Sequence, residues 1–158
     1  KRVYESAVSY TKTFSEGSDS LLFMGATGLG KTFLSGCIAR AVADKGYSVC
    51  YVSAGKLFSD FETEKFRLKE DGALTGEYLQ TDLLIIDDLG TEMTTQFTVS
   101  VLYQLLNTRL MEKKPVILST NLTPDELASL YSPQIASRIL GTYRLCQFCG
   151  DDIRFKIK

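Results

Sequence analysis

The chain has 158 residues, of which 44% are hydrophobic and 23% are charged, and its formal net charge is −1. This length suits one domain with its own core and is too short for two. The nearly neutral charge excludes an overall basic field, so contact with nucleic acid would need a local patch or several assembled copies. No apolar run approaches the roughly 20 residues that span a bilayer, and no signal peptide opens the chain, so we expect no membrane partner.

Patterns typical of helices and strands alternate along the first half of the chain. An amphipathic helix over residues 3–14 leads to the apolar run Leu21–Met24, which predicts a short buried strand. After a glycine-rich turn comes a helix that should end at Lys45 and Gly46, where a basic last turn meets a C-cap glycine. Residues 47–53 then predict another strand. The apolar face of the helix is predicted to contain Phe33, Leu34, Cys37, Ile38, Ala41 and Val42.

The alternation continues in the second half. Residues 55–80 form a charged helical stretch that is interrupted at Gly72. The run LLIIDD over residues 83–88 has four consecutive aliphatic side chains, which predicts a strand buried on both faces in the middle of a parallel sheet. Strands that alternate with helices indicate an α/β domain. The remaining predicted elements are a helix over 97–110, a strand over 116–120, a helix from Pro124 with a capping box from Thr123 to Glu126, a helix over 133–140 and a strand over 142–148.

The turn GATGLGKT matches the phosphate-binding pattern G-x-x-x-x-G-K-[ST] between a predicted strand and a predicted helix. Its glycines let successive backbone N–H groups point at phosphate oxygens, and the helix adds its positive end. In this pattern Lys31 reaches the β- and γ-phosphates, and the Thr32 hydroxyl ligates Mg²⁺. The loop predicts a nucleoside triphosphate and Mg²⁺ as ligands, but alone it does not distinguish a kinase, a GTPase or an ATPase. The predicted nucleotide-binding residues are Gly25, Ala26, Thr27, Gly28, Leu29, Gly30, Lys31 and Thr32.

Polar residues that could complete the chemistry follow later strands. Asp87 is predicted to coordinate Mg²⁺ through water, and Asp88 to orient or deprotonate the attacking water. Asp88 is one carbon shorter than the glutamate more often found there, so we expect slow basal hydrolysis. Asn121 can hold the attacking water or a γ-phosphate oxygen, and Arg138 is a candidate arginine finger for a neighbouring subunit. The plainer alternatives are solvated strand-end aspartates, a turn asparagine and a surface salt bridge.

Four cysteines are present. Cys37 and Cys50 fall in helical and strand-like patterns, where cysteine usually acts as a small buried hydrophobe. Cys146 and Cys149 form a single CQFC pair, which is half a zinc site, and the chain has no histidine to complete it. We predict reduced structural thiols and a cytoplasmic location, with a redox or metal role as the alternative.

Together, GATGLGKT, LLIIDDLG, LSTNLTPDEL and SRI resemble, in this order and spacing, the AAA+ ATPases of the bacterial helicase-loader type. This is the DnaC/DnaI family, to which the IstB transposition helpers are closely similar. The resemblance covers roughly residues 20–155. It implies a P-loop NTPase fold of the AAA+ type, with a mostly parallel five-stranded sheet in the order 5-1-4-3-2 and no C-terminal helical lid. It also implies that Gly25–Thr32 is Walker A, Asp87 and Asp88 are Walker B, Asn121 is sensor 1, and Arg138 acts in trans.

The resemblance also suggests an origin for the charged helical stretch. Initiator-type members insert extra helices after the second strand, and in relatives these shape a spiral whose inner face meets single-stranded DNA. Lys65, Arg67 and Lys69 are then candidate phosphate contacts, with Phe61 and Phe66 as candidate stacking groups. The alternative is a solvated face over a small apolar stripe.

We expect a helicase loader in DNA replication, which hydrolyses ATP at a protomer interface and delivers a replicative helicase onto single-stranded DNA. Self-association into an ATP-dependent spiral or ring is part of this expectation. Since the chain starts at Lys1, we expect residues 1–158 to be a single AAA+ domain separated from an N-terminal partner-binding domain, with residues 1–20 as lead-in helix and linker. Arg154 is a candidate for sensor 2, with Arg144 as the alternative. The rivals are an IstB-like helper that binds duplex DNA and a transposase, a P-loop small-molecule kinase, and a clamp that binds ATP without turnover.

Overall fold

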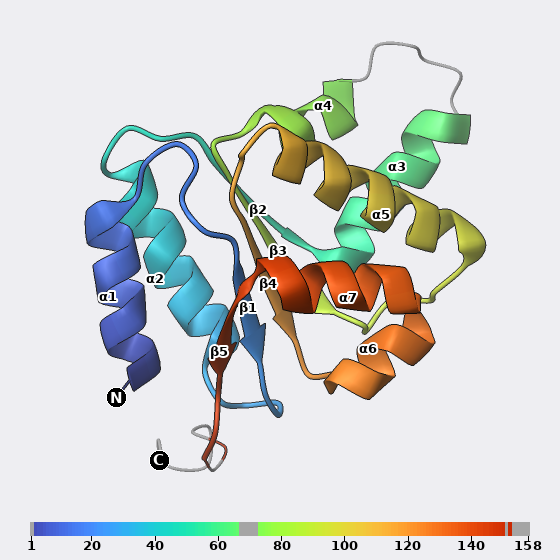
Figure 1. Ribbon diagram of the computed structural model, residues 1–158. Helices are drawn as coiled ribbons and strands as arrows, with labels where there is room; N and C mark the ends of the chain where they lie inside the picture. The colour runs from blue at the N-terminus through green and yellow to red at the C-terminus, as the bar shows by residue number, and fades with distance from the viewer. Residues whose placement is uncertain (1, 67–72, 151, 153–158) are drawn as a thin grey trace.

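The computed structural model describes residues 2–66, 73–150 and 152, and within them helices alternate with strands (Figure 1). The helices are α1 Arg2–Thr13, α2 Lys31–Ala43, α3 Ala54–Phe66, α4 Ala73–Gln80, α5 Gln96–Met111, α6 Pro124–Leu130 and α7 Pro133–Thr142. The strands are β1 Leu21–Met24, β2 Val49–Ser53, β3 Leu83–Leu89, β4 Val116–Thr120 and β5 Arg144–Gln147. The elements predicted from the sequence are present, with small shifts at their ends.

The strands form one parallel sheet in the order β2-β3-β4-β1-β5. This is the predicted order 5-1-4-3-2 counted from the other edge, so the fold prediction is confirmed. In a parallel sheet the carboxyl ends of the strands meet at one edge, which is where such folds place their ligands. The glycine-rich turn after β1, the aspartates near the end of β3 and the asparagine after β4 therefore converge.

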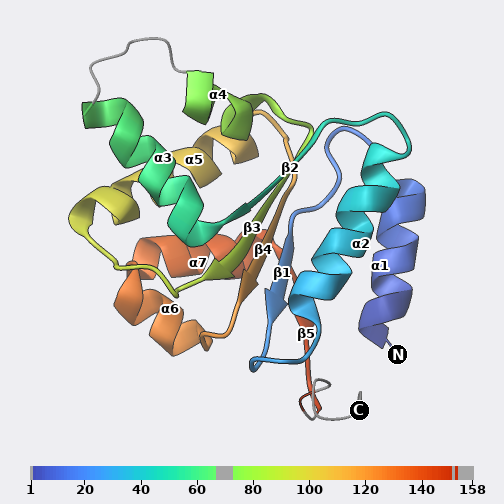
Figure 2. The same cartoon turned by 180° about the vertical axis from the view of Figure 1, so that it is seen from behind.

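Helices cover both faces of the sheet: α1 and α2 pack on one face, and α3 to α7 on the other (Figures 1 and 2). Side chains of β1 and β3 enter both cores, which explains why these strands are continuously apolar. The core under α1 and α2 includes Leu21, Phe23, Ile38, Ile85 and Ile117. The larger core on the opposite face includes Leu22, Leu84, Ile86, Leu102 and Leu118.

Helix α2 differs from the sequence prediction in two details, the residues on its buried face and the residue at which it ends. Leu34 and Ile38 pack into the core, but Phe33 is 74% exposed and Cys37 is also exposed. Residues four apart lie in one row along a helix, so the row that begins at Phe33 lies beside the buried row. Helix α2 also ends at Ala43, earlier than predicted.

Arg109 of α5 is fully buried, with 0% of the residue exposed, and its hydrogen bonds connect α5 to neighbouring elements. One guanidinium nitrogen, Nη1, donates to the carbonyl oxygens of Tyr78 at 2.9 Å and Thr81 at 3.0 Å, and Nη2 donates to that of Pro115 at 2.8 Å. Burial lowers the pKa of Arg109 to about 10. The side chain thus supplies a donor to carbonyls at the C-terminal end of α4, and it adds a second donor to the Pro115 carbonyl, which also accepts the N–H of Leu84 at 3.3 Å.

Candidate functional site

A pocket of about 460 Å³ opens at the carboxyl edge of the sheet. It brings together the glycine-rich turn, the end of β3 and the residue after β4, which are far apart in the sequence. Its lining residues are Thr27, Gly28, Gly30, Lys31, Thr32, Phe33, Asp88 and Asn121. Of the candidate chemical residues, Asp87 lies beside this pocket within the strand, and Arg138 is not among the lining residues.

Glycine is required in the turn at positions of close approach and of positive φ. A Cβ at Gly25 would fall 2.4 Å from the carbonyl oxygen of Phe148, whose N–H donates to Met24 at 2.8 Å. The chain after β5 therefore packs directly on the turn. Gly30, the N-cap of α2, has φ 87, which a residue with a side chain rarely adopts. These constraints hold the turn at the helix N-terminus, where phosphate binding is favourable.

The Lys31 ammonium is held by three uncharged acceptors. Nζ donates to the carbonyl oxygens of Gly25 at 2.6 Å and Ala26 at 2.8 Å, and to Oδ1 of Asn121 at 2.6 Å. Lys31 is only 5% exposed, and burial lowers its pKa, an effect that the carboxylates of Asp88 and Asp87 oppose. The candidate sensor residue, Asn121, thus contacts the Walker A lysine directly.

The Asp87 carboxylate is 5% exposed and is held from both neighbouring strands. The Tyr51 hydroxyl on β2 donates to Oδ2 at 2.7 Å, and the Ser119 hydroxyl on β4 donates to Oδ1. Burial, and then the hydrogen bond to Asp87, raise the pKa of Tyr51, so its phenol remains a donor. Neither hydroxyl was singled out in the sequence. The sequence could have indicated them only through the predicted position of their strands beside β3. Tyrosine and serine are common in strands, so their presence alone does not indicate a functional role.

Asp88 occupies a strained backbone position at the pocket. Its φ is 55, in the left-handed region, and it lies in a bulge where Asp87 and Asp88 stand opposite the single residue Ser119. Its N–H donates to the Ser119 hydroxyl oxygen at 3.0 Å. Burial raises the pKa of Asp88, the charge of Asp87 raises it further, and Lys31 opposes both. Strained residues of this kind cluster at functional sites.

Arg138 of α7 lies against α5. Its Nη1 donates to Oδ1 of Asn107, its Nη2 donates to the Tyr103 hydroxyl at 3.4 Å, and its guanidinium lies 5.0 Å from the centre of the Tyr103 ring. Within the part of the chain that the structure describes, these partners are uncharged, so the surface salt bridge considered from the sequence is not seen. The role of Arg138 in trans stays a prediction.

The candidate DNA contacts are only partly placed. Lys65 lies at the end of α3 with its ammonium 4.5 Å from the centre of the Phe97 ring. Arg67 and Lys69 lie outside the described residues, as do Arg154 and the side chain of Phe66. The Phe61 ring stacks on Tyr78, with 6.0 Å between ring centres, and packs against the core instead of standing free for a base.

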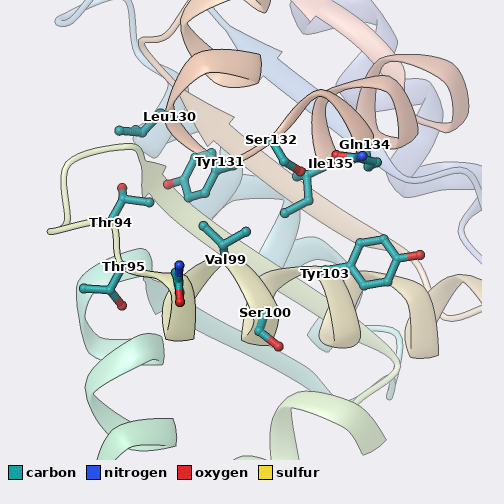
Figure 3. Close-up of a pocket in the computed structure, with 11 residues that line it drawn as sticks. Thr94, Thr95, Val99, Ser100, Tyr103, Leu130, Tyr131, Ser132, Gln134 and Ile135 are labelled. Atoms are coloured by element: carbon teal, nitrogen blue, oxygen red, sulfur yellow. Dashed lines mark hydrogen bonds between the residues drawn. The ribbon is translucent and has the colours of Figure 1, made fainter.

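A second and larger hollow, of about 620 Å³, lies between α5 and the α6–α7 pair (Figure 3). Val99, Ser100 and Tyr103 face it from α5, and Tyr131 and Ile135 from the other side. Its lining is uncharged, and it includes none of the residues predicted to bind nucleotide. It therefore lacks the charges that phosphate binding needs.

The cysteines show free thiols, of which Cys146 is buried, Cys50 is partly buried, and Cys149 is exposed like Cys37. The prediction of a buried thiol is therefore wrong for Cys37. Among residues 2–66, 73–150 and 152, no cluster of three or more histidine, cysteine or acidic side chains could hold a metal. The helices of the same residues include none that is long and apolar enough to cross a membrane.

Residues 6–151 match the family model described as IstB-like ATP binding protein. The chain belongs to this family. It is similar to the replicative helicase loader DnaC of Escherichia coli K12, at 25% identity over 154 residues, which are 96% of the chain and 62% of the loader. It is also 28% identical, over 126 residues, to a Mycobacterium tuberculosis protein whose name describes an ATP-binding protein in an insertion sequence; this covers 79% of the chain and 50% of that protein.

This chain also resembles a solved structure of the replication initiator DnaA bound to AMPPCP and single-stranded DNA. The TM-score is 0.82 at 26% identity, covering 99% of this chain and 49% of that one. The resemblance to AAA+ helicase loaders and IstB-like ATPases inferred from the sequence is thereby confirmed. The chain spans 62% and 50% of the lengths of the two curated relatives named above.

Proposed function

We propose that this domain binds ATP with Mg²⁺, hydrolyses it slowly and serves as the motor of a helicase loader in DNA replication. The observation that carries the proposal is the meeting of Lys31, Asp88 and Asn121 around one pocket beside the phosphate-binding turn, with Asp87 next to them. Membership of an ATP-binding family and similarity to a DnaA that binds AMPPCP support the nucleotide.

The residues present fit Mg²⁺ as well as ATP. A hydroxyl at Thr32 and a carboxylate at Asp87 are the hard oxygen ligands that this cation prefers, and both stand beside a helix N-terminus suited to phosphate. When bound, Mg²⁺ would neutralise charge on the phosphate oxygens. Lys31 would leave its neutral acceptors for the β- and γ-phosphates. Asp88 would accept the proton of the attacking water, which Asn121 would help to orient.

Arg138 would act on a second copy. It is held against α5 by neutral partners and does not line its own nucleotide pocket, so it is available to a neighbour. An arginine supplied in this way stabilises the charge on the transferring phosphoryl group. Nucleotide binding between two protomers would then couple hydrolysis to assembly and to delivery of a replicative helicase onto single-stranded DNA.

A second candidate is an ATPase that assists transposition. The family description and the relative from an insertion sequence favour it. The two candidates share the nucleotide chemistry and differ in partner. A helicase loader should be stimulated by single-stranded DNA, whereas a transposition helper should respond to duplex DNA and a transposase.

The test combines calorimetry with phosphate-release assays. Wild type should bind Mg-ATP and release phosphate slowly, faster with single-stranded DNA, whereas Lys31→Ala should lose binding. Arg138→Ala should bind ATP without hydrolysing it, and mixing it with Lys31→Ala should restore activity, since each copy supplies what the other lacks. Arg40→Ala, which removes an exposed arginine paired with Asp44 on α2, is the matched control and should behave as wild type. Absence of heat on ATP titration would refute the proposal, and normal hydrolysis by Arg138→Ala would refute the shared site.

A further inference from the structure

The Asp87 carboxylate is fixed by hydroxyl groups on both sides. Strands β2 and β4 flank β3, and the Cα partner of Asp87 on β2 is Ser53. Tyr51 lies two positions earlier on the same face of β2, and its long side chain reaches along the strand to Oδ2 at 2.7 Å. Ser119 occupies Oδ1 from the other side. Both oxygens therefore have a defined direction before any ligand arrives.

This arrangement leaves the carboxylate able to bind a cation. Each carboxylate oxygen has two lone-pair directions, and one hydroxyl uses one of them. The Lys31 ammonium, whose charge interacts with that of Asp87, is meanwhile held by two carbonyls and the Asn121 amide. No Lys31–Asp87 ion pair is found among the described residues. Lys31 and Asp87 are thus each held by neutral partners. No ion pair between them has to break before Lys31 binds phosphate or Asp87 binds a cation.

The hydroxyls of Ser119 and Tyr51 differ in their other contacts and in their exposure. Ser119 is fully buried and also accepts the N–H of Asp88 at 3.0 Å, so it supports the bulge as well as the carboxylate. Tyr51 lies on the edge strand and is 40% exposed, and its hydroxyl donates to Asp87. Phenylalanine at this position would keep the ring on the strand and lose only the hydroxyl.

We propose that Tyr51 is a positioning residue for the metal site: its hydroxyl holds Asp87 in the orientation that receives Mg²⁺. This inference rests on the proposed function, in which Asp87 serves Mg²⁺ bound with ATP. Groups that orient metal ligands typically change metal affinity or activity by about 10–100-fold when removed. Since a second hydroxyl remains on Asp87, we expect the Tyr51→Phe change to lie at the low end of that range.

The experiment measures metal affinity apart from turnover. A fluorescent ATP analogue is bound to each protein in EDTA, and Mg²⁺ is then titrated; Mn²⁺ binding is followed separately by electron paramagnetic resonance. Tyr51→Phe should bind the analogue in EDTA as wild type does, and should need about tenfold more Mg²⁺ or Mn²⁺ for half-saturation. Tyr47→Phe is the matched control, because its ring packs edge-on against Phe14 on the α1 side, and it should titrate as wild type.

A double variant tests whether Tyr51 acts through Asp87. In an Asp87→Ala background, Tyr51→Phe should have no further effect on Mn²⁺ affinity. Unchanged metal half-saturation in Tyr51→Phe, with wild type showing clear Mg²⁺ dependence, would overturn the inference and leave the proposed function standing. A wild type that binds the analogue without any dependence on Mg²⁺ would instead overturn the proposed role of Asp87.

Discussion

Replacing Asp88 by glycine should stabilise the domain and abolish ATP hydrolysis. The φ of 55 at Asp88 lies in the left-handed region, which costs an L-amino acid about 1–2 kcal/mol. Glycine avoids this cost, but its greater freedom in the unfolded chain offsets about 0.5–1 kcal/mol. The net gain in the free energy of unfolding is therefore roughly 0–1.5 kcal/mol, with a centre near 0.75 kcal/mol. For a domain of this length, the central gain raises Tm by about 1.5–3 °C.

The electrostatic environment of Asp88 should also make its replacement by glycine stabilising. Burial and the neighbouring Asp87 charge raise the pKa of Asp88, which means that its ionised form is disfavoured in the folded state. Lys31 offsets part of this effect. Removing the carboxylate should thus add to the gain in stability, while it takes away the group that we expect to accept the proton of water.

The assay compares thermal unfolding with phosphate release. Asp88→Gly should melt above wild type, bind ATP and release no phosphate. Lys113→Gly is the matched control, because Lys113 has φ 56 and follows α5 away from the nucleotide pocket; it should gain stability and keep wild-type turnover. If Asp88→Gly melts below wild type while Lys113→Gly melts above it, the Asp88 side chain stabilises the turn, and the strain argument is refuted.

Two further predictions concern the buried Arg109 and the titration of Asp88. Arg109→Met should lower the free energy of unfolding by about 3 kcal/mol or more, because the carbonyls of Tyr78 and Thr81 lose the guanidinium donor. Urea denaturation measures this change, and Arg40→Met, at an exposed arginine, is expected near wild type. The raised pKa of Asp88 means that the folded state binds a proton more readily than the unfolded chain. Stability should therefore fall as pH rises from the ordinary carboxyl range through that raised pKa, and Asp88→Asn should remove this slope in denaturation curves between about pH 4 and pH 8.

The fold was predictable because its signals are local and strong. The run of aliphatic residues in β3 indicates burial on both faces, and that alone places the strand inside a covered parallel sheet. The capping box at Thr123 predicts the start of α6, and the structure confirms both of its hydrogen bonds. The convergence of three motifs at one edge then follows from parallel topology, without any knowledge of side-chain positions.

The partners of the charged residues were not predictable for a different reason. Tyr51 contacts Asp87 only because β2 pairs with β3 in one register, and register is a property of two strands together. The exposure of Phe33 likewise depends on how α2 is rotated on the sheet, since the apolar pattern allowed a wider buried face. Charged motifs can be recognised in a sequence by their pattern, whereas tyrosine and serine in strands cannot be distinguished from ordinary strand residues.

One hydroxyl links the two aspartates into a single unit. Ser119 donates to the Asp87 carboxylate and accepts from the Asp88 N–H, and the bulge places both aspartates opposite it. A regular strand would direct these consecutive side chains to opposite faces of the sheet. The bulge and the left-handed backbone at Asp88 change that, so one carboxylate stays buried beside Tyr51 while the next reaches the pocket. The strain at Asp88 is therefore the structural condition for placing two carboxylates from adjacent positions at one nucleotide site.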